Sequence, residues 1–420
     1  MLISIKILLI LFYTNICWCC DTQYLKINDQ CYYNDDINFL KKLILHSQIG
    51  QNPPPIDINP LMLGLQKWED GRLVEFCCSS KSNTECNMDY SLYGELPVEI
   101  GNLTELRKLS IESNKIVGII PKDIGNLSKL EELSLSSNNI VGELPFEIGE
   151  LIALKKLSLK GNHLGGSLPI ELSNLKKLEW IYLSDNNFQG KISNFISEMK
   201  SLKYLNFSNN AFQGNIPKEI GNLKYLQYLN LSQNKLSGHI PSEIGFLNIY
   251  RLNLGFNNLN GSIPIELGKL DKLVQLNLES NELSGNIPHS IFSLKNLGKI
   301  ELQNNFLSGH LKIKYDSLNI LEELNISNNR LSGKIPKELG EFSNIRYINL
   351  SFNLFEGDVP TSLFSNQFLT TLFLNGNNLG GTIYSGICLD PGKKLLIYDN
   401  AFCPPYPECI KYIGNQKCIK

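Results

Sequence analysis

The side chains that most often carry out chemistry are sparse in this sequence and lie far apart. The five histidines of the 420-residue chain are His46, His163, His239, His289 and His310. General acid–base catalysis or a catalytic metal would need such groups close to carboxylate or thiol partners. No zinc-protease, nucleophile-elbow, phosphate-loop or dinucleotide motif occurs, and paired acids such as Glu131–Glu132 and Glu322–Glu323 are expected to be solvated surface charges. The sequence therefore predicts a protein that is not an enzyme and that holds neither metal nor cofactor.

The eleven cysteines indicate disulfide chemistry instead. Three lie near the start of the chain, at Cys17, Cys19 and Cys20. The other eight form two groups of four near the two ends: Cys31, Cys77, Cys78 and Cys86, then Cys388, Cys403, Cys409 and Cys418. An even number clustered in this way predicts disulfides formed in an oxidising compartment. Zinc is the alternative, but the ligand spacing is wrong and no histidine lies close to either group.

The first twenty residues, MLISIKILLILFYTNICWCC, are typical of a secretory signal peptide. Lys6 is their only charge, an apolar run follows from Ile7 to Phe12, and cleavage is expected around Cys19 or Cys20. An uncleaved anchor is the alternative, but Thr14 and Asn15 interrupt the run, and about 20 apolar residues are needed to cross a bilayer. We therefore expect residues 1–20 to be removed and the mature chain to have no transmembrane segment.

One sequence period organises most of the chain and must position any functional group. Asparagines recur every 24 residues, with one spacing of 23 between Asn234 and Asn257. The twelve positions are Asn114, Asn138, Asn162, Asn186, Asn210, Asn234, Asn257, Asn281, Asn305, Asn329, Asn353 and Asn377. Around each returns the frame L-x-x-L-x-L-x-x-N-x-L-x-G-x-I-P-x-x-I-G-x-L, and a degenerate unit with Tyr90 in place of asparagine precedes them. Such a period predicts a solenoid of stacked coils rather than several compact domains.

Each part of the frame has a structural reason. Alternating leucines predict a short strand with one buried face, and parallel strands stacked about 4.8 Å apart would form a sheet on the order of 60 Å long. A buried asparagine amide can bond N–H and C=O groups of its own and the next coil. The glycine allows a tight backbone, I-P favours an extended segment, and x-x-I-G-x-L predicts a 3-10 or single helical turn. We expect a curved α/β solenoid with its parallel sheet on the concave face.

The L-x-G-x-I-P-x-x-I-G-x-L half of the frame resembles plant-type extracellular leucine-rich repeats. Over about residues 31–420 the chain is similar to secreted polygalacturonase-inhibitor-like proteins and to the ectodomains of plant receptor kinases. The resemblance implies a right-handed superhelix with short 3-10 turns on the convex face, a second short sheet from the L-x-G-x-I-P part, and disulfide-bonded caps. It does not specify a ligand.

Both tips of such a stack need caps, because its apolar core would otherwise be exposed. We expect an N-terminal cap in residues 21–90, the repeat solenoid in residues 91–386 and a cysteine-rich C-terminal cap in residues 387–420. Within the first cap, Asn34-Asp35-Asp36 begins a predicted helix that runs through Ile49. The sequence alone leaves three connectivities open for each group of four cysteines. The resemblance implies the pairs Cys31–Cys77, Cys78–Cys86, Cys388–Cys403 and Cys409–Cys418.

Ligand recognition is expected at the variable strand positions, because packing fixes the frame residues. Strand alternation directs the residues on both sides of the middle leucine to the concave surface. The predicted ligand-binding residues there are Trp180, Tyr182, Tyr204, Tyr228, Arg251 and Phe256, and a smaller group comprises Tyr347, Phe352 and Phe373. Because Trp, Tyr and Arg dominate binding hot spots, these residues predict a contact surface for a sugar or a protein. The alternative is that aromatic residues simply suit strand surfaces.

Seven N-glycosylation sequons occur, and they divide into two classes. Those at Asn206, Asn230, Asn325 and Asn349 arise from the repeat frame itself and lie on the concave strands, where glycans would cover the aromatic residues. We therefore predict glycosylation at the three positions outside those strands, Asn102, Asn126 and Asn260.

These features predict a secreted, non-catalytic recognition module, extracellular or associated with a cell wall. A preorganised concave face would bind a protein or a cell-wall polysaccharide at low ordering cost. Two alternatives stay open: an inhibitor of extracellular cell-wall-degrading glycan hydrolases, which the resemblance suggests, and a structural or adhesive surface protein without a single ligand. The net charge of −2 argues against nucleic-acid partners, and no small-molecule cofactor is expected.

Overall fold

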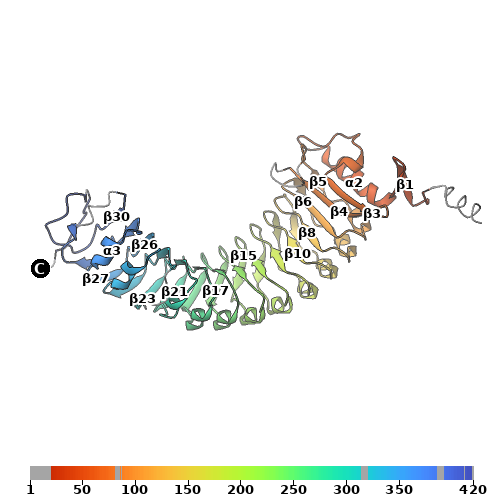
Figure 1. Ribbon diagram of the computed structural model, residues 1–420. Helices are drawn as coiled ribbons and strands as arrows, with labels where there is room; N and C mark the ends of the chain where they lie inside the picture. The colour runs from red at the N-terminus through yellow and green to blue at the C-terminus, as the bar shows by residue number, and fades with distance from the viewer. Residues whose placement is uncertain are drawn as a thin grey trace, which may run out of the picture.

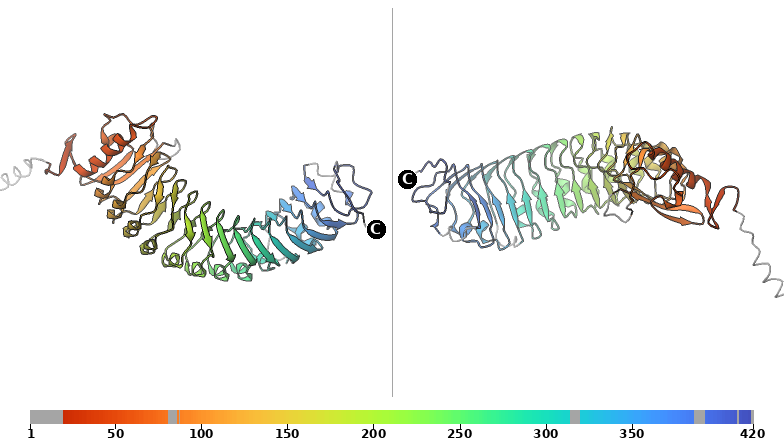
Figure 2. Two further views of the ribbon diagram at one scale, coloured as in Figure 1. Left: turned by 180° about the vertical axis from the view of Figure 1, so that it is seen from behind. Right: turned by 90° about the horizontal axis from the view of Figure 1, so that it is seen from above.

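The repeats stack into a long arc with the N-terminal helix at one tip and the C-terminal cap at the other (Figure 1). The computed structural model describes residues 20–80, 86, 88–313, 320–385, 392–410 and 412–418. Short turns follow the outer side of the arc and the strands lie inside them (Figure 2). The predicted curved solenoid is therefore confirmed, whereas the predicted signal peptide lies almost entirely outside the described residues.

A 15-stranded sheet in the described residues forms the concave face, in the order β3-β4-β6-β8-β10-β12-β14-β16-β18-β20-β22-β24-β26-β28-β30. Only the β3–β4 pair is antiparallel, and every later neighbour is parallel in register. The strands are β3 (Leu65–Glu69), β4 (Arg72–Ser79), β6 (Lys108–Glu112), β8 (Glu132–Ser134), β10 (Lys156–Ser158), β12 (Trp180–Tyr182), β14 (Tyr204–Asn206), β16 (Tyr228–Asn230), β18 (Arg251–Asn253), β20 (Gln275–Asn277), β22 (Lys299–Glu301), β24 (Glu323–Asn325), β26 (Tyr347–Asn349), β28 (Thr371–Phe373) and β30 (Lys394–Leu396). The sheet thus extends beyond both ends of the predicted repeat region.

A second set of strands runs beside the concave sheet, as the resemblance implied. It forms a nine-stranded sheet from β13 to β29 and two two-stranded sheets, β5–β7 and β9–β11. The strands are β5 (Tyr93–Glu95), β7 (Lys115–Val117), β9 (Val141–Glu143), β11 (His163–Gly165), β13 (Gln189–Lys191), β15 (Ala211–Gly214), β17 (Lys235–His239), β19 (Asn258–Ser262), β21 (Glu282–Gly285), β23 (Phe306–His310), β25 (Arg330–Gly333), β27 (Leu354–Asp358) and β29 (Asn378–Gly380). The frame glycine in these strands has a left-handed backbone, as at Gly214 with φ 76°, which explains why glycine recurs there.

The convex face consists of short helical turns, most of which begin directly after the frame proline. They are η2 (Val98–Asn102), η3 (Lys122–Asn126), η4 (Phe146–Glu150), η5 (Ile170–Asn174), η6 (Asn194–Glu198), η7 (Lys218–Asn222), η8 (Ser242–Phe246), η9 (Ile265–Lys269), η10 (Ile291–Ser293), η12 (Lys337–Glu341) and the helical turn α3 (Thr361–Ser365). A Cβ on Gly125 would lie 2.9 Å from the carbonyl oxygen of Glu147 in the next turn. The second frame glycine therefore lets adjacent turns pack closely.

Buried asparagine amides tie each coil to the coil before it. Asn234 Nδ2 donates to the carbonyl of Phe207 at 3.0 Å, and Asn234 Oδ1 accepts from the N–H of Phe212 at 3.0 Å. The same Nδ2 also donates to the carbonyl of Leu231 in its own coil. The prediction of bonds to the next coil is wrong, because backbone groups already serve that side: the N–H of Asn234 donates to the carbonyl of Phe256 at 3.2 Å.

The asparagine row is longer than predicted. The pattern recurs from Asn114 to Asn377, which confirms all twelve predicted positions as buried or nearly buried structural amides. It continues at Asn400, whose Oδ1 accepts from the N–H of Leu379 and whose Nδ2 donates to the carbonyl of Leu374. Strand β30 and Asn400 therefore form a further coil inside the region assigned to the C-terminal cap.

The N-terminal cap covers the first coil with a hairpin and a helix. Strands β1 (Tyr24–Ile27) and β2 (Gln30–Tyr33) pair antiparallel, helix α2 (Asn34–Ser47) follows, and the short turn η1 (Pro60–Met62) precedes β3. The predicted helix is confirmed, although it ends before Ile49, and it buries Phe39, Leu40 and Leu43 against the core. Burial of this apolar face closes the open end of the stack.

A buried ion pair fixes α2 to the concave sheet. The Asp36 carboxylate accepts from Arg72 Nε at 2.9 Å, from Arg72 Nη2 at 3.1 Å and from the N–H of Leu73 at 2.8 Å. The Arg72 guanidinium also lies 4.2 Å from the centre of the Tyr33 ring. Asp36 is completely buried, and the three hydrogen bonds that it accepts offset part of its desolvation.

The N-terminal disulfides differ from those implied by the resemblance. Cys20 pairs with Cys31, and Cys77 pairs with Cys86, while Cys78 is a buried free thiol. Because Cys77 and Cys78 are consecutive in β4, their side chains point to opposite faces, and only Cys77 points toward Cys86. Cys78 lies in the core, where burial raises the pKa of its thiol above the usual range. Cys20, which the signal-peptide prediction assigns to the removed segment, belongs to a disulfide of the cap.

The C-terminal pairs implied by the resemblance are also wrong. Cys403 pairs with Cys418, with their Cα atoms 4.7 Å apart, so neither can pair as expected. Cys409 is disulfide-bonded as well, and Cys388 lies outside the described residues. Both ends of the solenoid nevertheless carry disulfides, as predicted.

Candidate ligand-binding face

The concave sheet places four of the predicted residues in one row. Its register pairs Trp180 with Tyr204, Tyr204 with Tyr228, and Tyr228 with Arg251. The ring centres of Trp180 and Tyr204 are 6.2 Å apart with an interplanar angle of 15°, and those of Tyr204 and Tyr228 are also 6.2 Å apart. The three rings are half-buried and Arg251 is exposed. Four consecutive strands thus form a surface of three aromatic rings that ends in a guanidinium, hereafter the aromatic row.

Neighbouring charges hold the first ring of the aromatic row in place. The Lys203 ammonium lies 5.4 Å from the centre of the Trp180 ring and 2.6 Å from the Glu179 carboxylate. Lys203 and Tyr204 both belong to the coil after Trp180, so the side of the indole that faces this coil is covered. Cation–π and ring contacts of this kind restrain the indole before any ligand arrives.

Tyr182 lies in the next row of the same strands, beside Asn206. Burial raises the pKa of Tyr182, and the nearby Tyr204 and Tyr228 raise it further. The phenol therefore stays protonated near neutral pH and can donate a hydrogen bond. Two residues beyond Tyr182, after the end of β12, the hydroxyl of Ser184 is buried and has no hydrogen-bond partner among the described residues.

Phe256 does not join the aromatic row. It lies beyond the end of β18 in a left-handed turn with φ 56°, its side chain is exposed, and no ring contact of Phe256 occurs in the described residues. The smaller predicted group is assembled only in part: the rings of Tyr347 and Phe373 meet edge to face at 5.9 Å, whereas Phe352 occupies the repeat position of Phe256. Alternation within a strand predicts a shared face, but it does not extend to residues after the strand ends.

The sequon asparagines differ in accessibility. Asn102 and Asn126 are exposed at the ends of η2 and η3, whereas Asn260 lies half-buried in β19 of the second sheet, so it is outside the concave strands but not outside every strand. On the concave face, Asn206 Oδ1 accepts from the N–H and the hydroxyl of Ser208, which are groups of its own sequon. This arrangement agrees with a structural role for the concave asparagines, while occupancy of Asn102, Asn126 and Asn260 stays a prediction.

At least one acid of each pair forms an ion pair with a lysine of a neighbouring coil. Glu131 lies 2.6 Å from Lys155, and Glu323 lies 2.9 Å from Lys299.

Sequence reasoning overlooked Glu279, Glu301 and Gln303, which gather beyond the aromatic row on β20 and β22 and directly after them. A signal was present: Glu301 interrupts a run of asparagines at its repeat position.

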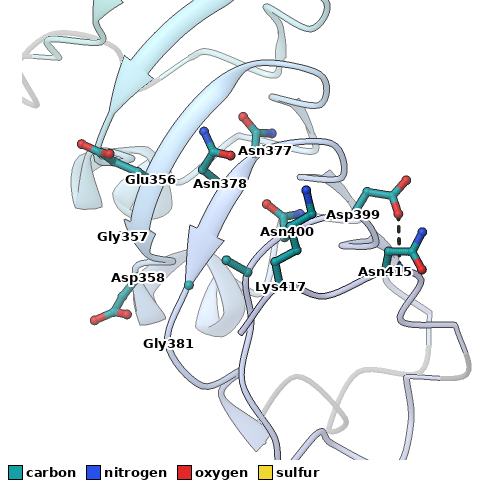
Figure 3. A pocket seen from close by; sticks show the side chains of 12 residues that line it. Glu356, Gly357, Asp358, Asn377, Asn378, Gly381, Asp399, Asn400, Asn415 and Lys417 are labelled. Carbon is teal, nitrogen blue, oxygen red and sulfur yellow. Dashed lines mark hydrogen bonds between the residues drawn. The ribbon is translucent and has the colours of Figure 1, made fainter. Parts of the chain in front are cut away.

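A separate hollow of about 730 Å³ lies between the second sheet and the C-terminal cap (Figure 3). Glu356, Asp358 and Asp399 line it together with Lys417 and several asparagines, and Asp399 Oδ1 accepts from the N–H of Asn415. The Asp358 carboxylate lies against Gly381.

No group of three or more His, Cys, Asp and Glu side chains within the described residues could hold a metal ion. None of the helices in the described part of the chain combines the length and apolar character needed to cross a bilayer.

Comparisons with known proteins agree with this architecture. The profile described as "Leucine-rich repeat region" matches residues 90–203 and 119–230, and the profile "Leucine Rich Repeat" matches 225–247, 248–270, 272–294 and 321–342. No curated protein matches the sequence. Among solved structures, a TDR receptor is 34% identical with a TM-score of 0.71, and the plant peptide hormone receptor RGFR1 in complex with RGF2 is 34% identical with a TM-score of 0.68.

Each alignment covers a different share of this chain and of the solved structure that it matches. The TDR receptor alignment covers 76% of this chain and 60% of that one, and the RGFR1 alignment covers 74% and 54%. A leucine-rich-repeat protein of Leptospira interrogans is 33% identical with a TM-score of 0.60, over 76% of this chain and 78% of that one. This chain thus spans less than two thirds of the length of the two receptors. The chain belongs to the leucine-rich-repeat family.

Proposed function

We propose that the chain is an extracellular recognition module that binds a peptide or protein ligand along its concave face. The observation that carries this proposal is the aromatic row, in which consecutive strands bring Trp180, Tyr204, Tyr228 and Arg251 together on a restrained surface. Rigid aromatic and arginine side chains bind at low entropic cost. The solved complex of the peptide hormone receptor RGFR1 supports a peptide as the kind of ligand.

Two features favour a peptide over a polysaccharide. Lys203 and Tyr204 cover one side of the Trp180 indole, so a sugar ring could stack on that side only by displacing them. Tyr182 and Arg251 add hydrogen-bond donors that suit backbone carbonyls and carboxylates. A cell-wall polysaccharide is an alternative that the experiment below separates from a peptide. A glycan hydrolase to be inhibited and an adhesive role without one ligand are further alternatives.

Extracellular placement is part of the proposal. Cys20–Cys31, Cys77–Cys86 and Cys403–Cys418 are disulfides, and such bonds persist in oxidising compartments. The apolar N-terminal stretch, with its single charge at Lys6, is the sequence feature that would direct the chain there.

The proposal can be tested by selecting ligands from unbiased libraries. Immobilised protein would be offered a displayed library of random peptides and, in parallel, an array of cell-wall glycans. Peptides recovered on the wild type would then be measured against Trp180→Ala and against Tyr225→Ala, an exposed aromatic outside the concave sheet. We expect Trp180→Ala to weaken binding about tenfold or more, as loss of an aromatic hot spot does, and Tyr225→Ala to leave it unchanged.

Two results would contradict the proposal, and each points to a different conclusion. Peptides that bind wild type and Trp180→Ala equally would show that the aromatic row is not the contact surface. Recovery of glycans but no peptides would replace the peptide ligand with a polysaccharide.

A further inference from the structure

A connected polar cluster lies on the concave face beyond the aromatic row, across β20, β22 and β24. Asn277 Nδ2 donates to Glu279 Oε1 at 2.8 Å and to Glu301 Oε2 at 3.3 Å. Gln275 Nε2 donates to Glu301 Oε2 at 3.3 Å, and Gln303 Nε2 donates to Glu279 Oε2. Amide donors thus hold the carboxylates of Glu279 and Glu301, on successive coils, in fixed positions. We call Gln275, Asn277, Glu279, Lys299, Glu301, Gln303 and Glu323 the acidic cluster.

The acidic cluster carries more negative than positive charge. Lys299 is its one ammonium, 3.2 Å from Glu301 Oε1 and 2.9 Å from Glu323 Oε2, and the hydrogen bond to Glu323 raises the pKa of Lys299 and keeps it charged. Three carboxylates against this ammonium leave a net charge of −2. Within the described residues Glu279 forms no ion pair and receives only neutral amide donors.

Gln303 gives an independent sign that the cluster is incomplete. Its side chain is 9% exposed, and its Oε1 is one of three buried side-chain atoms in the described residues that lack a hydrogen-bond partner. Leaving a buried acceptor unpaired costs free energy comparable to a lost hydrogen bond. The bond from Nε2 to Glu279 directs this amide into the cluster, so a donor that reached Oε1 would also lie beside the uncompensated carboxylate.

The two other unpaired atoms occupy the same repeat position. Ser184 Oγ and Asn375 Oδ1, like Gln303 Oε1, belong to residues two places before a frame asparagine. Each follows a concave strand, at β12 and β28 respectively. Among the described residues, unsatisfied buried side-chain groups are therefore confined to one column of the proposed contact surface, and among them only Gln303 lies beside an unpaired carboxylate.

The geometry points to the acidic cluster as the binding site for an arginine side chain of the ligand. This assignment rests on the proposed function, because it names one residue type that a peptide on the concave face must present. The acceptors lie on neighbouring coils about 4.8 Å apart, which suits a planar guanidinium with five N–H donors better than a single ammonium. Arginine is also more weakly hydrated than lysine and loses less on entering a half-buried site.

The assignment is compatible with the positive charges nearby. Arg251 pairs in register with Gln275 and lies four residues before the repeat position of Glu279, which corresponds to about 13 Å along the strand direction. Its backbone position is therefore well separated from that of Glu279 along the strand direction, and Arg251 lies outside the acidic cluster. Lys299 is already paired with two carboxylates.

The test uses the full chain and a displayed library of random peptides, and its readout is the residue composition of the selected peptides. Selection would be repeated on Glu279→Gln, which keeps the shape of the side chain and removes its charge. Glu282→Gln is the matched control, because Glu282 is an exposed glutamate in β21 of the second sheet. We expect one position of the peptides selected on wild type to be enriched in arginine, and Glu279→Gln to weaken those peptides about tenfold, as loss of a charge-assisted hydrogen bond does.

Each result has a defined meaning. Arginine enrichment that is lost on Glu279→Gln and kept on Glu282→Gln supports the site. Peptides that depend on Trp180 but show no arginine preference, or show equal preference for lysine, would overturn the assignment and leave the proposed function intact. An arginine preference that survives Glu279→Gln would also overturn it. Absence of any peptide that depends on Trp180 would overturn the proposed function itself.

A second substitution separates a lost contact from a folding defect. Gln303→Met removes the unpaired acceptor, together with the hydrogen bond from Nε2 to Glu279, and leaves the charge unchanged. Unfolding by urea would confirm that both variants are folded. We expect Gln303→Met to weaken the arginine-bearing peptides several-fold and to leave peptides without arginine unchanged. Equal weakening of both kinds of peptide would count against a specific contact.

Discussion

At the scale of single residues, the asparagine amides do most to define the fold. Each one bonds backbone groups that the end of a strand leaves without ladder partners, as Asn234 does for Phe207 and Phe212. Hydrophobic repeats alone would allow coils to slip, whereas an amide that must meet both an N–H and a C=O permits one register. The recurring asparagine is therefore a structural residue, and its recurrence carries no information about the ligand.

Replacement of one such amide should be costly. In Asn234→Ala the N–H of Phe212 and the carbonyls of Phe207 and Leu231 lose a buried partner. We expect a loss of about 3 kcal/mol in unfolding free energy, measured by urea denaturation. Lys235→Ala, at the exposed neighbouring position, should change it by less than about 0.5 kcal/mol. Equal effects of the two substitutions would show that the amide row does not hold the coils together.

The free thiol at Cys78 offers a second test at this scale. Burial raises the pKa of Cys78, so little thiolate forms. The buried position also blocks the access of a reagent to the sulfur. We expect alkylation of Cys78 to be negligible in the native protein and rapid after unfolding without reductant. Peptide mapping should recover Cys77 linked to Cys86. Recovery of Cys78 linked to Cys86 would restore the pairing that the resemblance implied.

At the scale of elements, the sequence predicts the repeat well and the caps poorly. Strands, 3-10 turns and the glycine positions follow from local patterns that recur in every coil. A wrong prediction at one coil can therefore be corrected by comparison with the other coils. Caps occur once. The pairing of Cys77 rather than Cys78 depends on which face of β4 each side chain occupies. Asn400 is hidden because its coil keeps only Leu395 of the frame leucines and has Pro404 at the position of the frame glycine.

The N-terminal cap should be sensitive to loss of its ion pair. Asp36→Ala would leave the Arg72 guanidinium and the N–H of Leu73 without their buried acceptor. We expect a destabilisation of about 3–5 kcal/mol, whereas Asp35→Ala, which removes only a charge in the first turn of α2, should cost less than about 1 kcal/mol. The two values would come from denaturation of each variant.

Hydrogen exchange would show where the damage lies. Because coils contact only their neighbours, Asp36→Ala should speed exchange in α2, β4 and the first coils and leave β20 to β28 protected. Uniform loss of protection along the chain would contradict a solenoid of neighbour-dependent coils.

At the scale of the whole molecule, the coils stack in register, so residues that recur with the sequence period lie side by side on one surface. The aromatic row could be predicted because strand alternation by itself assigns Trp180, Tyr182, Tyr204 and Tyr228 to one face. The acidic cluster could not, because its significance depends on hydrogen bonds between coils and on a partner that Gln303 Oε1 lacks. Phe256 lies outside the row because it follows the strand, where alternation no longer applies.

The central claim, that the ligand lies along the concave face, is tested most directly by photo-cross-linking. The tightest peptide from the selection would carry a photoreactive group, and adducts on the protein would be located by mass spectrometry. The account predicts adducts on concave residues from β12 to β22, and adduct yield that falls with Trp180→Ala. Adducts concentrated outside the concave sheet, for example at the exposed Tyr225 and Phe246, would contradict it.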